Sequence, residues 1–461
     1  MMRSKWIRKA LLVLLCGVLF TGCSSASTKE TEQRSSLKIM YADEAYFFMQ
    51  YGDLFAMQYP DIDIEVITTN SIYSEDPQDY NKAFADFIEE KQPDVVMLSL
   101  DNYEKFAAEG KLLELDTLIE RDKYDIGSIY PALIEILKKK GDGKLYGLAP
   151  SFYGNALFYN ADLFAKYGVE VPHDGMTWQE IIDTARRFPT DGDEKTRIYG
   201  FGSDYGMSME ELASAIANTQ GLKDINTDTM KITLNTDSWK QVYKLAKDAI
   251  DSGTIYNPKD GGFQGGTLED YYQSQVFLMG RSAMTTGRSH LLSNIKNAKN
   301  TLKDYNPFQV GIVAGPADPA EPDKSRDINI NELSAIRANS PNVDAAWEFL
   351  KFVNGEPFAK IKSKSLNNGL LSRMGYSKEY DGVSLDAFYK LQPNLDGASS
   401  LDNDKIPQSF YSQYRPIVDR ELKLVEEKKK SIEEALQTIE QEGQAVLDKA
   451  VKDEAPKKND E

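Results

Sequence analysis

The chain has few of the side chains that most enzyme mechanisms use. Its 461 residues include only two histidines and two cysteines. Cys16 lies inside an apolar N-terminal run that has the character of a removable signal. If that run is removed, Cys23 has no disulfide partner. Stability must then come from an apolar core, which a chain of this length can bury. A catalytic histidine would have to be His290, or His173 in its Pro-His-Asp-Gly turn.

Motifs that would indicate an enzyme or a nucleotide-binding protein are also absent. The sequence contains no His-Glu-x-x-His motif, no P-loop and no dinucleotide fingerprint. Its 72 acidic residues offer too many pairs to exclude a two-carboxylate glycosidase. The preferred interpretation is a protein that is not an enzyme and that needs no cofactor and no metal.

Positive charges are outnumbered by negative ones, with 54 Lys and Arg against 72 Asp and Glu. The formal net charge is −18, and removal of residues 1–22, with four basic and no acidic residues, gives −18 − 4 = −22. Such a chain is repelled by nucleic acid and by anionic lipid headgroups, so we expect no nucleic-acid partner. No apolar run after Phe20 approaches the ~20 residues that a membrane-spanning helix needs.

The N-terminus has the pattern of a secretory signal. Four basic residues precede an apolar run from about Ala10 to Phe20, and Thr-Gly-Cys23 follows. This arrangement resembles the bacterial lipoprotein signal, although Phe20 departs from the usual aliphatic residue; an ordinary signal peptide is the alternative. The resemblance implies a signal at 1–22, lipidation of Cys23 and a polar tether over 23–36. We therefore expect a lipid-anchored protein on the outer face of the cell membrane.

Strand and helix patterns alternate along the rest of the chain. Leu37–Tyr41 and Ile62–Ile67 read as strands, and Pro93–Leu98 is a short apolar run typical of a buried parallel strand. Gln50–Tyr59 reads as a helix, and Asp101 is placed to cap the next one. This alternation indicates an α/β fold.

Several further helix starts are predicted from capping patterns. In a capping box, a Ser or Thr and a Glu three residues later satisfy each other's backbone amides. Ser340, before a proline, is expected to cap a helix that runs to Val353. The boxes are Thr177 with Glu180, Ser208 with Glu211, and Ser431 with Glu434.

Seven stretches occur in an order and spacing that is more specific than any of them alone. They are Pro93-Asp-Val-Val96, Gly110–Leu115, Gly143–Pro150, Asn155–Phe164, Gly280–Met284, Ser340–Leu350 and Ser431–Leu436. Together they resemble the extracellular solute-binding proteins of ABC importers, in the carbohydrate-binding family that includes maltose-binding protein.

The resemblance implies a two-lobe periplasmic-binding-protein-like fold, with two α/β lobes, a hinge and a ligand cleft between them. Sheets of this kind bind ligands beyond the carboxyl ends of their strands. Crossings between the lobes are expected near Pro150–Tyr153, near Asp323–Asn331 and shortly after Phe358. The expected division is 37–152 plus 327–362 for lobe one, 153–326 plus 363–455 for lobe two, and 456–461 as a disordered tail.

A sugar site needs carboxylates or amides for hydroxyl groups and aromatic rings for C–H faces. Asp101 falls where the family places a sugar-binding aspartate, with helix capping as its alternative role. The other candidates at strand ends, at the first crossing and before a capped helix are Asp43, Glu44, Tyr46, Tyr103, Phe152, Tyr153, Asp204 and Tyr205.

Two places depart from the family pattern or extend it. Arg288 and His290 stand where the family often has tryptophan, which hints at an acidic or strongly polar sugar; a surface ion pair is the alternative for Arg288. Tyr411 and Tyr414 stand where the family has an aromatic platform, three residues apart on one predicted helix. A core role for one of these two tyrosines is the alternative.

The function that these features imply is capture of a carbohydrate. The ligand would be an oligosaccharide, passed to the membrane permease subunits of an ABC transporter by a monomer that closes about its hinge. The alternatives are a binding protein for another polar solute, such as a peptide, polyamine or phosphoester, and a surface glycoside hydrolase or lyase.

Overall fold

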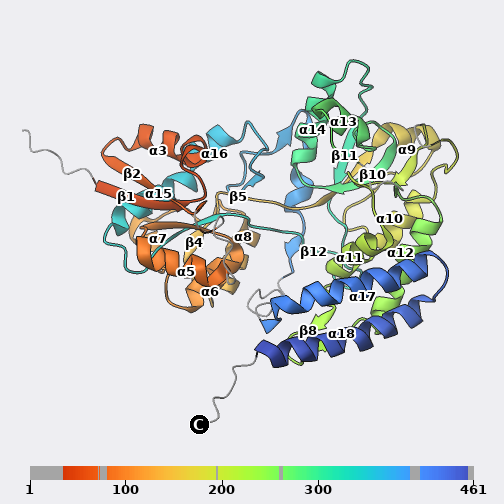
Figure 1. Ribbon diagram of the computed structural model, residues 1–461. Helices are drawn as coiled ribbons and strands as arrows, with labels where there is room; N and C mark the ends of the chain where they lie inside the picture. Colours follow the sequence, from red (N-terminus) through yellow and green to blue (C-terminus); the bar gives the residue numbers. More distant parts are fainter. Residues whose placement is uncertain are drawn as a thin grey trace, which may run out of the picture.

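The computed structural model describes residues 35–70, 72, 80–193, 196–258, 263–394 and 405–454. Two α/β lobes lie side by side and are joined by several crossing segments (Figure 1). The predicted fold class is therefore confirmed. The predictions for the signal, for Cys23 and for the tail at 456–461 lie outside the described residues.

Lobe one is built on a five-stranded sheet in the order β2-β1-β3-β13-β4. β1 is parallel to β2 and β3, whereas β13 is antiparallel to β3 and β4. All residues of β3 and β13 are buried, as expected for central strands between helices. The strands are β1 (Ser35–Tyr41), β2 (Ile62–Thr68), β3 (Val95–Leu98), β4 (Gly147–Leu148) and β13 (Leu333–Ile336).

The helices of lobe one lie on both sides of this sheet, with α3 and α16 above it and α5 and α6 below it in Figure 1. They are α2 (Glu44–Phe47), the π-helical turn η1 (Phe48–Gly52), α3 (Asp53–Gln58), α5 (Tyr80–Lys91), α6 (Leu100–Ala108), α7 (Asp116–Asp122), α8 (Pro131–Lys140), α15 (Val343–Val353) and α16 (Glu356–Lys362).

Lobe two has a four-stranded sheet in the order β11-β6-β10-β7, in which β10 and β7 are parallel. The strands are β6 (Ala156–Asn160), β7 (Tyr199–Phe201), β10 (Ser282–Gly287) and β11 (Val310–Val313). The helices are α9 (Ala161–Tyr167), α10 (Trp178–Ala185), α11 (Met209–Thr219), α12 (Asp237–Asp251), α13 (Leu268–Ser274), α14 (His290–Thr301), α17 (Gln408–Glu426) and α18 (Ile432–Glu454).

The last two helices, α17 and α18, pack against each other on lobe two (Figure 1). α18 also lies beside a small hairpin of β8 (Ile225–Asn226) and β9 (Lys231–Ile232), where Gln444 accepts from the Ile232 amide at 3.0 Å. The C-terminal part of the chain thus completes lobe two.

The crossing segments are joined to one another by short strand pairs. β5 (Ser151–Phe152) pairs with β14 (Leu370–Leu371), and β12 (Lys324–Ser325) pairs with β17 (Gln392–Pro393). Tyr153 exchanges backbone hydrogen bonds with Asn329, at 2.8 and 2.7 Å. These pairs tie the crossings together, as a hinge requires.

The third crossing begins later than the sequence predicts. Arg373 donates to the backbone oxygens of Asn354 and Asp125, each at 3.0 Å, and so belongs with lobe one. The segment that ends at Arg373 thus contacts lobe one, whereas the sequence assigns residues after 362 to lobe two. Ser35 and Ser36, which the sequence assigns to the tether, pair with β2.

The three capping boxes are confirmed, but two predicted caps are wrong. The boxes at Thr177, Ser208 and Ser431 are all formed. α6 is capped by Ser99, whose hydroxyl accepts from the Asn102 amide at 3.3 Å, so Asp101 lies in the first turn. Ser340 instead donates to Asp94 at 2.6 Å, and α15 begins at Val343 with Asn342 as its N-cap residue.

Candidate functional site

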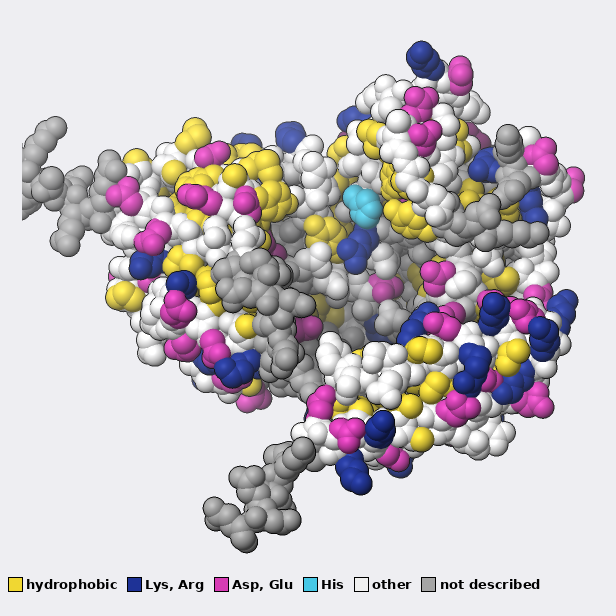
Figure 2. Space-filling model, viewed as in Figure 1, with side chains coloured by type: hydrophobic (Ala, Val, Ile, Leu, Met, Phe, Trp, Pro, Cys, Tyr) yellow, Lys and Arg dark blue, Asp and Glu magenta, His cyan; other side chains and the backbone are white. Residues whose placement is uncertain are grey.

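Lobe one presents a group of tyrosines around one carboxylate at the carboxyl end of β1. Tyr41 ends β1, and the exposed ring of Tyr46 stacks on it with the ring centroids 6.1 Å apart. The hydroxyls of Tyr41 and Tyr51 both hydrogen-bond Glu332. Burial raises the pKa of Glu332, while these two hydrogen bonds lower it. The surface is hollowed where the two lobes meet (Figure 2).

Tyr153, on the first crossing, connects this group to lobe two. Burial raises the pKa of Tyr153, and the charges of Tyr46 and Glu332 raise it further. The guanidinium of Arg288, which follows β10, lowers the pKa and lies 5.2 Å from the centre of the Tyr153 ring. Side chains of both lobes and of a crossing segment therefore meet at one place.

The charge of Arg288 has a partner at the second crossing. Burial raises the pKa of Asp327, and hydrogen bonds from Asn155 and Asn218 and the charge of Arg288 lower it. Asn218 donates its side-chain amide to Asp327 at 3.2 Å. The positive charge that would have favoured an acidic sugar is thus opposed by the half-buried carboxylate of Asp327.

A second polar group of lobe two forms where β7 and β10 end. The two strands are parallel, so the segments that follow them emerge at the same edge of the sheet. Asp204 follows β7, and burial raises its pKa while the charge of His290 lowers it. His290 follows β10, and burial lowers its pKa while the charge of Asp204 raises it. Tyr205 is exposed beside them, and Asp204 and Tyr205 both raise the pKa of Tyr271.

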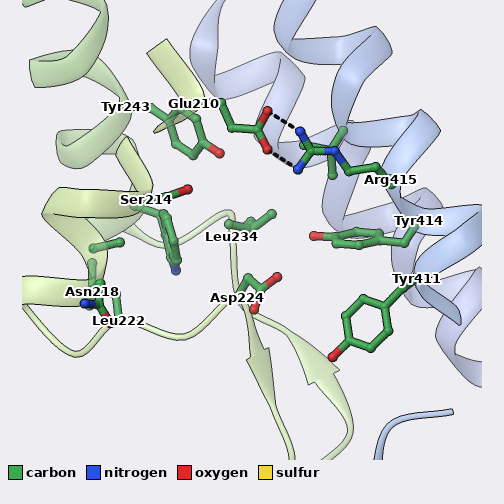
Figure 3. A pocket seen from close by; sticks show the side chains of 13 residues that line it. Glu210, Ser214, Asn218, Leu222, Asp224, Leu234, Tyr243, Tyr411, Tyr414 and Arg415 are labelled. Atoms are coloured by element: carbon green, nitrogen blue, oxygen red, sulfur yellow. Dashed lines mark hydrogen bonds and ion pairs between the residues drawn. The ribbon is translucent and has the colours of Figure 1, made fainter. Parts of the chain in front are cut away.

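The two C-terminal tyrosine candidates line a pocket of about 530 Å³ in lobe two (Figure 3). Tyr411 is 43% exposed, whereas Tyr414 is 6% exposed and stacks on Phe410, with the ring centroids 4.7 Å apart. Arg415, from the same helix, is joined to Glu210 of α11 by two charged hydrogen bonds of 2.6 and 2.8 Å. The pocket also contains Asp224, whose pKa is raised by burial.

Two of the predicted ligand-binding side chains, Tyr103 and Phe152, lie in the core of this structure. Tyr103 is fully buried; its hydroxyl donates to the backbone oxygen of Leu137 at 3.0 Å and accepts from the Tyr146 amide at 3.2 Å. Phe152 is also fully buried and packs on Tyr130, with the ring centroids 5.2 Å apart. Neither ring can reach a ligand.

Three predicted acidic residues are exposed on lobe one. Asp43 accepts from the Tyr46 amide at 2.8 Å as the N-cap of α2, and Glu44 follows it. Asp101 is exposed in the first turn of α6. Their roles as ligand contacts stay predictions.

Several residues around Tyr153 and in the pocket beside α17 were not predicted from the sequence. Arg415 directly follows a predicted residue, and Asp327 and Glu332 lie in or just beyond the predicted second crossing, so their positions offered a usable signal. Tyr41 ends a predicted strand, whereas Tyr243 and Asp224 gave no such signal. Within the described ranges no three His, Cys, Asp or Glu side chains form a group that could hold a metal ion.

Two lobes that share crossing segments and present aromatic and acidic side chains around a common hollow define a two-lobed ligand-binding protein. The chain belongs to the family of bacterial extracellular solute-binding proteins, whose sequence profile matches residues 41–360. Membership of this extracellular family implies a location outside the cytoplasm. Among the described helices, none has the length and apolar character to span a bilayer.

Similar proteins include curated binding proteins. The arabinooligosaccharide-binding protein of Bacillus subtilis is 25% identical over 374 residues, covering 79% of this chain and 78% of that protein. The sn-glycerol-3-phosphate-binding periplasmic protein of Brucella abortus is 25% identical over 231 residues, about half of each chain. These relatives are binding proteins, which agrees with the expectation that the chain is not an enzyme.

Solved structures share the fold. The sugar-binding protein MalE of Xanthomonas citri has a TM-score of 0.63 and 16% identity, covering 90% of this chain and 98% of that one. An ABC substrate-binding protein of Listeria monocytogenes in complex with cycloalternan has a TM-score of 0.54 and 21% identity, with the same coverage. These likenesses support the two-lobe fold.

Proposed function

We propose that this protein captures an oligosaccharide between its two lobes and delivers it to the permease of an ABC importer. The observation that carries the proposal is the meeting of Tyr46, Glu332 and Arg288 around Tyr153, with contributions from both lobes and a crossing. Aromatic rings offer faces for the C–H surface of sugars, and carboxylates accept hydrogen bonds from hydroxyls. The relative named for arabinooligosaccharides supports this ligand class.

Capture requires no bond to be made or broken. A ligand that contacts both lobes stabilises the closed arrangement more than the open one and shifts the population toward it. The crossings, tied by short strand pairs, would bend while each lobe moves as a unit. We further propose that the protein acts as a monomer held at the membrane by lipid on Cys23, with the folded lobes facing outward.

A thermal-shift screen tests the ligand class. The panel contains neutral oligosaccharides, sn-glycerol 3-phosphate, a peptide mixture and spermidine. A ligand at 100 times its Kd adds about 2.7 kcal/mol of stability, which is readily measured as a rise in Tm. Stabilisation by an oligosaccharide alone supports the proposal, and stabilisation only by one of the other solutes contradicts it. A product assay on the same samples should show the oligosaccharide intact, because turnover would indicate a glycoside hydrolase or lyase.

A further inference from the structure

The pocket between α11, α12 and α17 surrounds the two predicted tyrosines of α17 with polar groups that were not predicted from the sequence. Instead of a flat platform, the tyrosines of α17 face Asp224 and residues of α11 across a half-open pocket (Figure 3). The aromatic side chains that line it are Trp239, Tyr243, Tyr411 and Tyr414. Its volume of about 530 Å³ is sufficient for a sugar ring.

The hydroxyl of Tyr414 points to a missing ligand group. The residue is 6% exposed, and its hydroxyl oxygen is buried without a hydrogen-bond partner among the described residues. Buried tyrosine hydroxyls usually have a partner. Figure 3 shows this hydroxyl directed into the pocket rather than into the helix packing.

The charge that the pocket leaves unbalanced is negative. Asp224 forms no ion pair with any lysine or arginine in the described part of the chain, and its charge raises the pKa of both Tyr411 and Tyr414. Arg415 is already engaged, by Glu210 and by Asp419 at 3.0 Å. An anionic ligand would meet Asp224 with no cation free to compensate for the repulsion.

The pocket also lies next to the crossing segments. Asn218 lines it and donates to Asp327, whose carboxylate interacts with Arg288 beside Tyr153. An oligosaccharide bound at Tyr153 could therefore extend past Asp327 and Asn218 into this pocket.

We propose that this pocket binds one ring of the oligosaccharide, that the ring is neutral or amino-substituted, and that acidic sugars are rejected. Asp224 accepts hydrogen bonds from hydroxyl or amino donors of the ring, and Tyr414 supplies a second polar contact. Tyr411 covers an apolar face of the ring. This inference rests on the proposed function and specifies its substrate class, against the acidic sugar that Arg288 suggested.

The inference is tested by calorimetry with six trisaccharides. The probes are arabinotriose, xylotriose, cellotriose, maltotriose, the glucosamine trisaccharide of chitosan, and trigalacturonic acid. We expect the tightest ligand to be neutral or amino-substituted. If trigalacturonic acid binds most tightly, the charge assignment is overturned while the proposed function survives. If no trisaccharide binds, the proposed function fails and this inference fails with it.

Two variants then locate the binding in this pocket. Tyr414→Phe removes only the unpartnered hydroxyl, so Tm should be unchanged or higher while affinity for the best trisaccharide falls. Asp224→Asn removes the charge, and we expect affinity to fall roughly 10-fold or more, most for an amino-substituted probe. Asp86→Asn, at an exposed site on α5 of lobe one, controls for the loss of one charge. Unchanged affinity in both pocket variants would overturn the assignment, even if Tm fell.

Discussion

Arg288 lies over the face of Tyr153, with its guanidinium carbon 5.2 Å from the ring centre. The arginine comes from lobe two and the tyrosine from the first crossing, so this contact lies where the lobes would move relative to each other. A guanidinium over an aromatic ring is favourable and also fixes the ring orientation. The exposed side of Tyr153 is thereby held as a surface for a ligand.

Replacement of Tyr153 tests this surface. Tyr153→Leu keeps apolar bulk but removes the aromatic face, so we expect affinity for the oligosaccharide to fall about 2- to 10-fold. Tyr153→Phe keeps the face and should bind within about twofold of the wild type. Calorimetry on the two variants measures the difference, and equal affinities would remove Tyr153 from the ligand site.

Four half-buried carboxylates predict an unusual contribution to pH dependence. The pKa values of Asp204, Asp224, Asp327 and Glu332 are all raised, with burial as the largest cause. The folded state therefore holds these protons more tightly than the unfolded state. Their contribution to the free energy of unfolding is greatest at low pH and decreases as pH rises from about 4 through the raised values.

Glu332→Gln isolates one of these groups. Glutamine keeps an oxygen that can accept from Tyr41 and Tyr51, but it does not titrate. The free energy of unfolding of the variant should therefore decrease less steeply with rising pH than that of the wild type across the same window. Urea melts at a series of pH values measure both slopes. Parallel curves would mean that Glu332 titrates alike in the folded and unfolded states.

Variants of Asp101 and Ser99 distinguish a role in ligand binding from a role in helix capping. Because Asp101 lies in the first turn of α6 and not at its cap, Asp101→Asn should cost less than about 1 kcal/mol of stability. If it contacts sugar hydroxyls as predicted, affinity falls about 10- to 150-fold. Ser99→Ala should show the reverse, losing about 1 kcal/mol of stability with affinity unchanged. Calorimetry and thermal melting of both variants decide, and unchanged affinity in Asp101→Asn refutes the ligand contact.

The fold was predictable because its signals are local. Capping boxes and short apolar strands are each contained within a few residues, so Thr177 and Ser208 start helices as predicted. The third crossing depends on contacts between Arg373 and residues far away in the sequence, Asp125 and Asn354, and no local pattern marks them. The sequence therefore gave no signal for these contacts of the third crossing.

The site was less predictable, because the direction of a side chain is set by packing. Tyr103 and Tyr153 both follow predicted buried strands or turns, yet Tyr103 enters the core while Tyr153 meets Arg288. Glu332 was not predicted because it precedes a strand, whereas the predicted candidates follow strands. β13 runs antiparallel to β3, so its amino end lies at the edge where β1 ends, and Glu332 immediately precedes it.

The membrane anchor can be tested separately from the fold. Cys23→Ser should abolish lipidation and release the protein into the medium, since no other attachment is predicted from the sequence. Fractionation of cells that lack the permease, with detection of the protein in membrane and medium, measures this. Retention of the Cys23→Ser variant on the membrane under these conditions would refute the anchor.

Closure about the crossings predicts a change of shape on binding. A ligand that touches Tyr46 on lobe one and Arg288 on lobe two is fully contacted only when the lobes approach. Small-angle scattering at saturating oligosaccharide should therefore give a smaller radius of gyration than the ligand-free protein. Tyr153→Leu, at a ligand concentration raised to restore saturation, controls for affinity and should compact equally. An unchanged radius for the saturated wild type would mean that the ligand occupies one lobe without bridging to the other.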